Sequence, residues 1–150
     1  MTGYDKPLPR VDDPVQAPFW KAAAQHRFAL QECGTCGARR WPPAPLCPEC
    51  LTTGGDWVEV ESTGRIWSYA VYDHAYRSSF ANDIPYNVAV VDLDAGPTMI
   101  SNIVDAAPED LRIGDCVTVV FDDITADVTL VKFAIAHGEA DSAAGTERRP

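Results

Sequence analysis

Basic residues are scarce in this sequence, and long apolar runs are missing. Its 150 residues include 12 Lys and Arg against 22 Asp and Glu, which gives a formal net charge of -10. Such a surface repels phosphate backbones at long range and argues against general nucleic-acid binding. No apolar run approaches the roughly 20 residues of a membrane-spanning helix, and the first residues, MTGYDKPLPRVDDP, do not resemble a signal peptide. We therefore expect a soluble, cytoplasmic protein with no membrane partner.

The sequence also lacks recognisable catalytic machinery. It contains no phosphate-binding glycine loop and no convincing pair of a nucleophile and its base. The three histidines, His26, His74 and His137, lie in unrelated contexts. Cys116 begins a predicted strand, and we expect it to be a small buried apolar residue. We therefore expect no turnover by this chain alone.

Five consecutive segments differ in composition and pattern. Pro18 fits the first turn of a short helix, because its missing N–H is not needed there. From Trp57 onward the chain is a series of strand patterns separated by turn signals. The predicted division is an extended arm over 1–13, an N-terminal helix over 14–27, a zinc ribbon over 28–54, a barrel over 55–137 and a disordered tail over 138–150.

The segment 55–137 predicts a small β-barrel with five strand regions. They are WVEVES joined to RIWSYAVY, then NVAVVDL, TMISNIV, CVTVVF and VTLVKFAIA. The first is long and bends at Gly64, and a short helical turn, PEDL, lies between the third and fourth. This layout is typical of the OB-fold, a partly open five-stranded barrel, although five strands fit other small barrels too. The predicted fold class is mainly β, with an N-terminal helix and a rubredoxin-like zinc ribbon before the OB-fold.

Four of the five cysteines form two CxxC pairs, Cys33 with Cys36 and Cys47 with Cys50. Each pair places two thiolates on one tight turn, and four sulfurs fill the tetrahedral shell of Zn²⁺. A shell of four thiolates leaves no position for water or substrate, so the predicted zinc site is structural. The alternative is coincidental core or redox cysteines, but a redox CxxC needs a βαβ setting that is absent.

Two stretches are candidates for contact with a ligand or a partner. Arg39, Arg40 and Trp41 form a compact basic and aromatic cluster between the two CxxC pairs, suited to a phosphate or an adenine. The loop DHAYRSSFANDIPY between the first two barrel strands contains Tyr76, Arg77 and Phe80, and OB-folds usually bind ligands through this loop. Ordinary ribbon surface and a solvated loop remain the alternatives.

The order of these motifs resembles a known family, the stand-alone zinc-ribbon plus OB-fold proteins that accompany thiolase-superfamily enzymes acting on acyl-CoA. The resemblance covers about 19–136. It is carried by FW, CGTCGARRWPPAPLCPEC, GRIWSYAV, PYNVAVVDLD, ISNIVD and LRIGDCVTVVF. It implies a thiolase-like or lipid-transfer-protein-like partner that supplies the catalytic residues, a coenzyme A thioester as the ligand of the complex, and zinc on the four cysteines named above.

Two functions of different classes follow. The first is a non-catalytic accessory subunit of a thiolase-like or aldolase complex that makes or breaks a carbon–carbon bond in acyl-CoA substrates. In that role, the helix face around Phe19 and Trp20, the edge Trp41-Pro42-Pro43 and the loop 74–86 are expected to meet the partner or complete its acyl-CoA site. The second is a nucleic-acid-binding module, which is disfavoured because the barrel segment carries few basic residues.

Overall fold

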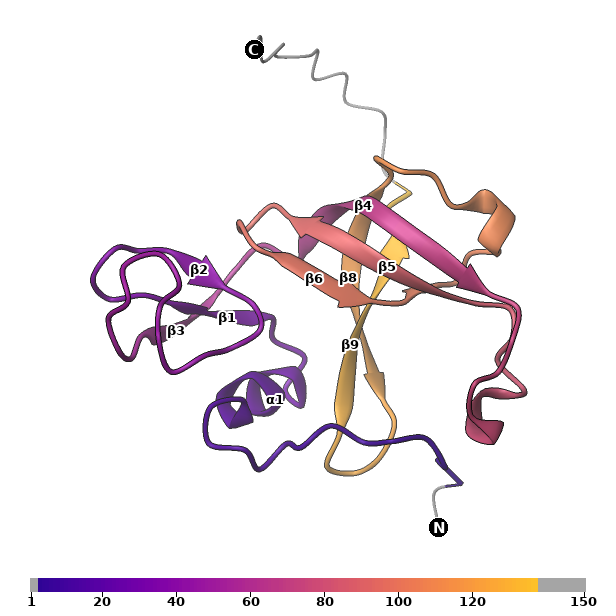
Figure 1. Cartoon of the computed structure of the whole chain (residues 1–150), viewed down its shortest axis with the longest axis horizontal. Helices are drawn as coiled ribbons and strands as arrows, with labels where there is room; N and C mark the ends of the chain where they lie inside the picture. The colour runs from indigo at the N-terminus through magenta and orange to yellow at the C-terminus, as the bar shows by residue number, and fades with distance from the viewer. Residues whose placement is uncertain (1–2, 138–150) are drawn as a thin grey trace, which may run out of the picture.

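The computed structural model describes residues 3–137, and its elements follow the predicted order (Figure 1). One short helix precedes a three-stranded sheet, which is followed by a six-stranded sheet. The mainly β fold class is therefore confirmed. The elements are α1 (Ala17–Ala23), β1 (Ala29–Glu32), β2 (Arg39–Arg40), β3 (Asp56–Glu59), β4 (Thr63–Tyr72), η1 (Ser78–Phe80), β5 (Tyr86–Leu93), β6 (Thr98–Ser101), β7 (Ile103–Val104), η2 (Pro108–Asp110), β8 (Cys116–Asp123) and β9 (Thr129–Ile135). The predicted tail over 138–150 lies outside the described residues.

Helix α1 is shorter than the predicted segment 14–27. It ends at Ala23, and the backbone of His26 adopts a left-handed conformation with φ 54°. The His26 N–H donates to the Ala23 carbonyl at 2.8 Å, and the Arg27 N–H donates to the Ala22 carbonyl at 3.0 Å. This pair of bonds is the Schellman motif, which closes a helix and sends the chain away from its axis.

The small sheet has the order β2-β1-β3, with antiparallel pairing throughout. The prediction that WVEVES begins the first barrel strand is wrong for residues 57–59, because β3 pairs with β1, from Ala29 opposite Glu59 to Glu32 opposite Asp56. Gly55 permits this close return of the chain, since a Cβ at its position would lie 2.7 Å from the carbonyl oxygen of Glu32. Its φ of 146° also favours glycine.

The large sheet has the order β6-β5-β4-β8-β9-β7. Its two end strands, β6 and β7, come from the single predicted strand TMISNIV and are separated only by Asn102. The buried side chain of Asn87 holds this break: its Nδ2 donates to the Ile103 carbonyl and its Oδ1 accepts from the Ile103 N–H, both at 2.7 Å. The sheet therefore curls into a partly open barrel, with the opening between β6 and the first half of β9.

One hydrophobic core joins the helix, the small sheet and the barrel. Its largest fully buried members include Phe19 of α1, Leu30 of β1 and Phe133 of β9. Phe19, on the helix face predicted to meet a partner, is buried in this core instead, since it is 2% exposed. Figure 1 shows α1 beneath the small sheet and beside the long β8–β9 hairpin. This packing fixes the zinc-ribbon segment against the barrel.

Candidate functional site

The four predicted ligands, Cys33, Cys36, Cys47 and Cys50, lie together, with all their sulfur atoms within 4.8 Å of one another. The Sγ atoms of Cys33 and Cys50 are 3.6 Å apart, and those of Cys36 and Cys47 are also 3.6 Å apart. A tetrahedral zinc with bonds of about 2.3 Å separates its sulfurs by roughly 3.8 Å. The four thiols therefore fit one zinc ion.

Two matching turns create this arrangement. In the first turn, the Gly37 N–H donates to the Cys33 carbonyl at 2.9 Å; in the second, the Leu51 N–H donates to the Cys47 carbonyl at 2.9 Å. Gly37 and Leu51 both have positive φ, at 74° and 60°. The left-handed residue after each CxxC turns the chain back so that both thiols of the pair face the same point. Leu51 adopts this left-handed conformation at an exposed position, since the residue is 74% exposed.

Hydrogen bonds shift the pKa values of the ligand thiols. The Thr52 Oγ1 lies 3.0 Å from the Cys50 Sγ and 3.4 Å from the Cys33 Sγ. This hydroxyl, together with backbone N–H groups, lowers the pKa of Cys33 to about 5 and lowers that of Cys50 as well. At Cys36 the hydrogen bond from the Ala38 backbone lowers the pKa, but burial and bonding among the thiols outweigh it and raise the pKa to about 12. In the metal-free site Cys36 therefore retains a proton that zinc must displace.

A zinc ion held by these four thiolates would have a closed coordination shell. Cys33 and Cys47 are buried, Cys50 is half-buried and Cys36 is exposed, so the site lies at the edge of the ribbon. Such a site supplies folding energy to a segment that is too small to build its own core. It offers no open position for a substrate.

Arg40 is not free to meet a phosphate, because its guanidinium group is buried in the ribbon with 4% exposure. Its Nε donates to the Gln31 Oε1 at 2.9 Å, and its Nη2 donates to the carbonyls of Ala44 at 3.0 Å and Gly54 at 2.6 Å. Arg40 thereby ties β2 to the loops on both sides of the second CxxC pair. This bonding removes Arg40 from the candidate ligand-binding residues.

Arg39 and Trp41 are also engaged inside the molecule. The Arg39 Nε donates to the Glu32 carboxylate at 3.0 Å, and its Nη1 donates to the Ala95 carbonyl in the turn between β5 and β6 at 3.4 Å. Trp41 is half-buried, with its ring 4.2 Å from that of Phe19. The basic and aromatic cluster of the sequence is therefore mainly the joint between ribbon and barrel.

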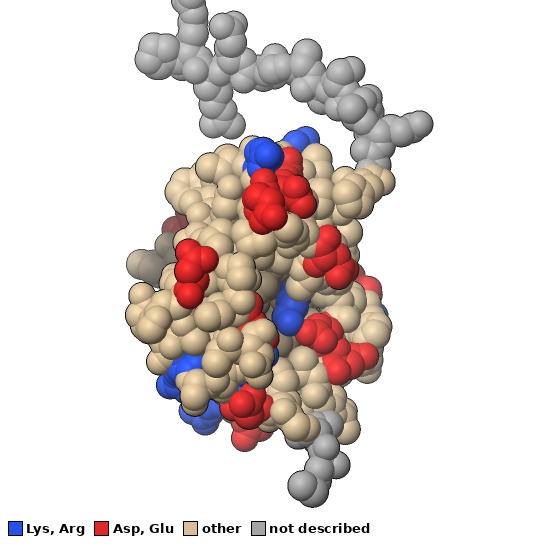
Figure 2. All heavy atoms as spheres, turned by 90° about the vertical axis from the view of Figure 1, so that its right-hand side faces the viewer, with Lys and Arg blue, Asp and Glu red and all other residues tan. Residues whose placement is uncertain are grey.

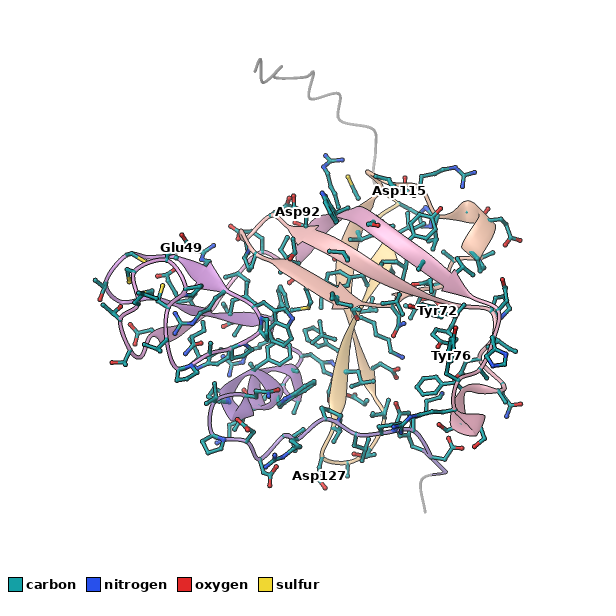
Figure 3. The ribbon with its side chains drawn as sticks, viewed as in Figure 1. Glu49, Tyr72, Tyr76, Asp92, Asp115 and Asp127 are labelled. Carbon is teal, nitrogen blue, oxygen red and sulfur yellow. The ribbon has the colours of Figure 1, made fainter. Side chains whose placement is uncertain are left out.

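The loop between β4 and β5 differs, because it leaves several groups available. Tyr76 is 76% exposed, and the side chain of the exposed Arg77 makes no hydrogen bond or ion pair within residues 3–137. The ring of Tyr76 lies 6.3 Å from that of Tyr72 at the end of β4, and both lie at the barrel end that contains η1 (Figure 3). Phe80 is half-buried in the same loop.

A pocket of about 520 Å³ lies beside this loop. The N-terminal arm forms one of its walls, which the sequence did not predict. Lys6 of the N-terminal arm reaches across to Asp83 at 2.7 Å, with its Nζ 5.6 Å from the centre of the Phe80 ring. Lys132 lines the opposite wall and pairs with Asp122 at 2.6 Å. Figure 2 shows this side of the molecule, with acidic groups around a hollow that holds a basic side chain. An extended arm has no pattern that reveals where it docks.

Cys116 is exposed at the start of β8, so the prediction of a buried apolar residue is wrong. Its position pairs with Arg65 of β4 near the barrel rim. Strand position alone does not distinguish a rim residue from a core residue.

Two family models match the chain. Residues 20–54 match the rubredoxin-like zinc ribbon domain of ChsH2, and residues 57–122 match its C-terminal OB-fold domain. A DUF35 domain-containing scaffold protein of Methanothermobacter thermautotrophicus is 37% identical over 104 residues, covering 68% of this chain and 77% of that protein. This chain belongs to the ChsH2/DUF35 family.

The chain is also similar to one further relative and to two solved structures. A probable enoyl-CoA hydratase alpha subunit of Thermomonospora curvata is 40% identical over 127 residues; these cover 83% of this chain but 39% of that longer protein. A solved structure described as an Ltp2-ChsH2(DUF35) aldolase matches with a TM-score of 0.76 and 34% identity, covering 85% of this chain and 98% of the matched chain. A DUF35 protein of Sulfolobus solfataricus, at 12% identity and a TM-score of 0.58, shares the fold.

The described part of this DUF35 chain contains no helix with the length and apolar character needed to cross a membrane.

Proposed function

We propose that this chain is a non-catalytic, zinc-binding accessory subunit of a complex that makes or breaks a carbon–carbon bond in acyl-CoA substrates. The observation that carries the proposal is the similarity along 85% of the chain to the DUF35 chain of an Ltp2-ChsH2 aldolase. The hydratase-related name of the Thermomonospora curvata relative supports a CoA thioester as the substrate class. A thiolase-like or lipid-transfer-protein-like partner supplies the reacting groups.

The chemistry of the described residues suits an accessory role. A four-thiolate zinc site has no exchangeable position, and its energy stabilises the ribbon that packs on the barrel. The exposed residues His74, Tyr76 and Arg77 are not arranged as a nucleophile with its base; the His74 and Tyr76 rings meet edge to face at 5.1 Å. The isolated chain therefore turns over no acyl-CoA.

The loop between β4 and β5 is our candidate for contact with coenzyme A. Arg77 is an exposed cation with no ion pair among residues 3–137, and its guanidinium group suits a phosphate. Tyr76 offers an exposed ring beside it, on which an adenine stacks. Phe80 lies in the same loop, with its ring centroid 5.6 Å from that of Tyr86. Of the six predicted contact residues, these three remain candidates for CoA.

A nucleic-acid-binding module is the second candidate function, because OB-folds and zinc ribbons both occur in such proteins. The formal net charge of -10 opposes it. Tight binding of single-stranded DNA or RNA at low salt, with a steep loss on added salt, would promote this candidate over the first.

The test is co-expression of the chain with each thiolase-like protein of the same genome, followed by gel filtration and an acyl-CoA cleavage assay. We expect one partner to co-elute, and only the complex to be fully active. Arg77→Ala should raise the apparent KM for the CoA substrate and leave the complex intact, whereas Arg10→Ala, at an exposed arginine of the arm, should change neither. A partner that is soluble and fully active alone would refute the proposal.

A further inference from the structure

The outward face of β6, β5 and β4 is unusually apolar for the surface of an acidic protein. In one row across the sheet, Ile100 of β6 pairs with Val90 of β5, and Val90 pairs with Ser68 of β4. In the next row, Val88 of β5 pairs with Ala70 of β4. None of these side chains is fully buried, and Ile100 is 68% exposed. Figure 1 shows these strands side by side, with no described helix or strand across the outward face.

A β-bulge adds a large aromatic ring to this face. The register shifts between Ile66 and Ser68, so that Trp67 is the extra residue opposite the regular strand β5. Ile66 points into the core with 1% exposure, and Trp67 is 65% exposed. A bulge re-aims a side chain at a fixed point of a sheet. Here it places an indole ring beside the row that contains Val90 and Ile100.

The same face continues into a pocket at the opening of the barrel. The pocket has a volume of about 230 Å³, and Ile100 belongs both to its wall and to the sheet face. The rest of the wall is largely apolar and includes Trp20, Trp41 and Val131. Among residues 3–137, its one charged residue, Lys132, is paired with Asp122 at 2.6 Å. Aromatic or aliphatic side chains of one protein commonly anchor in such pockets of another.

Charge on this face is sparse and balanced. Along the paired outward positions of β4, β5 and β6, the charged residues are Arg65 and Asp92, which lie opposite each other. Asp92 and Tyr72 mark the two ends of the face in Figure 3. Depletion of charge together with aromatic enrichment is the composition of a protein-interface core.

We infer that this surface, defined as the outward face of β6-β5-β4 with the adjoining pocket, is where the catalytic partner docks, inserting an apolar side chain beside Ile100. The inference rests on the proposed function and specifies its interface. The occupant is a different protein with an uncharged apolar patch. A second copy is disfavoured because each chain carries a formal charge of -10, and an anionic lipid surface is disfavoured for the same reason.

The test introduces a charge at two exposed positions of the face. Ile100→Glu and Trp67→Glu should each weaken the Kd for the co-purified thiolase-like partner at least about tenfold, because a carboxylate would be left unpaired in an apolar contact. Leu8→Glu is the matched control at another exposed apolar residue, 48% exposed on the arm, and should change the Kd less than about twofold. Circular dichroism and zinc content would verify that each variant is folded.

Each result separates this inference from the proposed function. Partner binding that both variants leave unchanged would refute the docking surface and keep the accessory-subunit proposal. The absence of any binding partner for the natural chain would refute the proposed function itself. Sedimentation of the natural chain as a dimer that Ile100→Glu dissociates would assign the face to a second copy and overturn our choice of occupant.

Discussion

His26, just past the end of α1, contacts Asp123 at the end of β8, with its Nε2 3.0 Å from both carboxylate oxygens. Its ring also stacks on Phe121, with centroids 5.1 Å apart and planes inclined by 3°. The left-handed turn that ends the helix thus places the His26 imidazole against the β8–β9 hairpin. This contact joins the N-terminal helix to the barrel through residues 97 positions apart.

The first prediction concerns the acid sensitivity of this contact. The Thr129 hydroxyl, at 2.6 Å, and His26 lower the pKa of Asp123 below its ordinary value of 3.8. A carboxyl with a lowered pKa stabilises the fold above its unfolded value and loses that contribution as the pH falls through its folded value. Asp123→Asn should therefore destabilise the protein at neutral pH, and the difference should shrink below about pH 3.8.

The measurement is the free energy of unfolding in urea at pH 6 and at pH 3, for the natural chain and the variant. Asp127→Asn is the control, because Asp127 is exposed at the tip of the same hairpin (Figure 3) and its side chain makes no hydrogen bond to the part of the chain that the structure describes. Equal pH dependence in the natural chain and Asp123→Asn would contradict the prediction.

The second prediction concerns zinc affinity. The Thr52 hydroxyl bonds two ligand sulfurs, and partners of this kind typically contribute a factor of about 10 to 100 to metal affinity. Thr52→Val should weaken zinc binding by about that factor, measured by competition with a chromophoric chelator. Thr35→Val is the control, since the Thr35 contact to Cys33 uses its backbone N–H. Unchanged affinity in Thr52→Val would show that the hydroxyl is dispensable.

The cysteine spacing was sufficient to predict the metal site, because two CxxC turns impose their own geometry on four ligands. The sheet that the start of WVEVES joins could not be predicted in the same way. WVEVES has the strand pattern that both sheets need, and the close approach at Gly55 decides which sheet it joins. Alternation identifies a strand but does not identify its neighbour.

The roles of the charged candidates could not be predicted either. Arg39, Arg40 and Arg77 look alike in sequence, yet only Arg77 projects unpaired into solvent. Arg40 is buried because Gln31 and two backbone carbonyls from distant parts of the ribbon surround it. Such a cage forms only when the chain has folded, and it has no local sequence pattern.

The third prediction tests the close packing at Gly64, where β4 passes between β5 and β8. A Cβ at this position would lie 2.5 Å from the carbonyl oxygen of Asp92 and 2.9 Å from the Val91 Cγ1. Gly64→Ala should therefore destabilise the barrel by about 1–3 kcal/mol, the usual cost of overpacking. Urea unfolding would measure this loss. Gly34→Ala, where no atom lies within 4 Å of the added methyl group, should cost far less.

The last prediction separates the structural arginine from the candidate ligand-binding one. Arg40→Ala removes the donors that satisfy the carbonyls of Ala44 and Gly54 in a buried site, and it leaves the Gln31 Oε1 with only the Ala44 N–H as a donor from the described residues. Unsatisfied buried groups cost about 1–3 kcal/mol each, so the ribbon should unfold more readily and release zinc faster to a chelator. Arg77→Ala should change neither property, because Arg77 is exposed and unpaired. Arg39→Ala serves as the neighbouring control: its ion pairs are 33% exposed on the arginine side, and such pairs contribute about 1 kcal/mol or less. If Arg40→Ala kept its zinc as firmly as Arg77→Ala, the buried guanidinium would not be what holds the second CxxC turn in place.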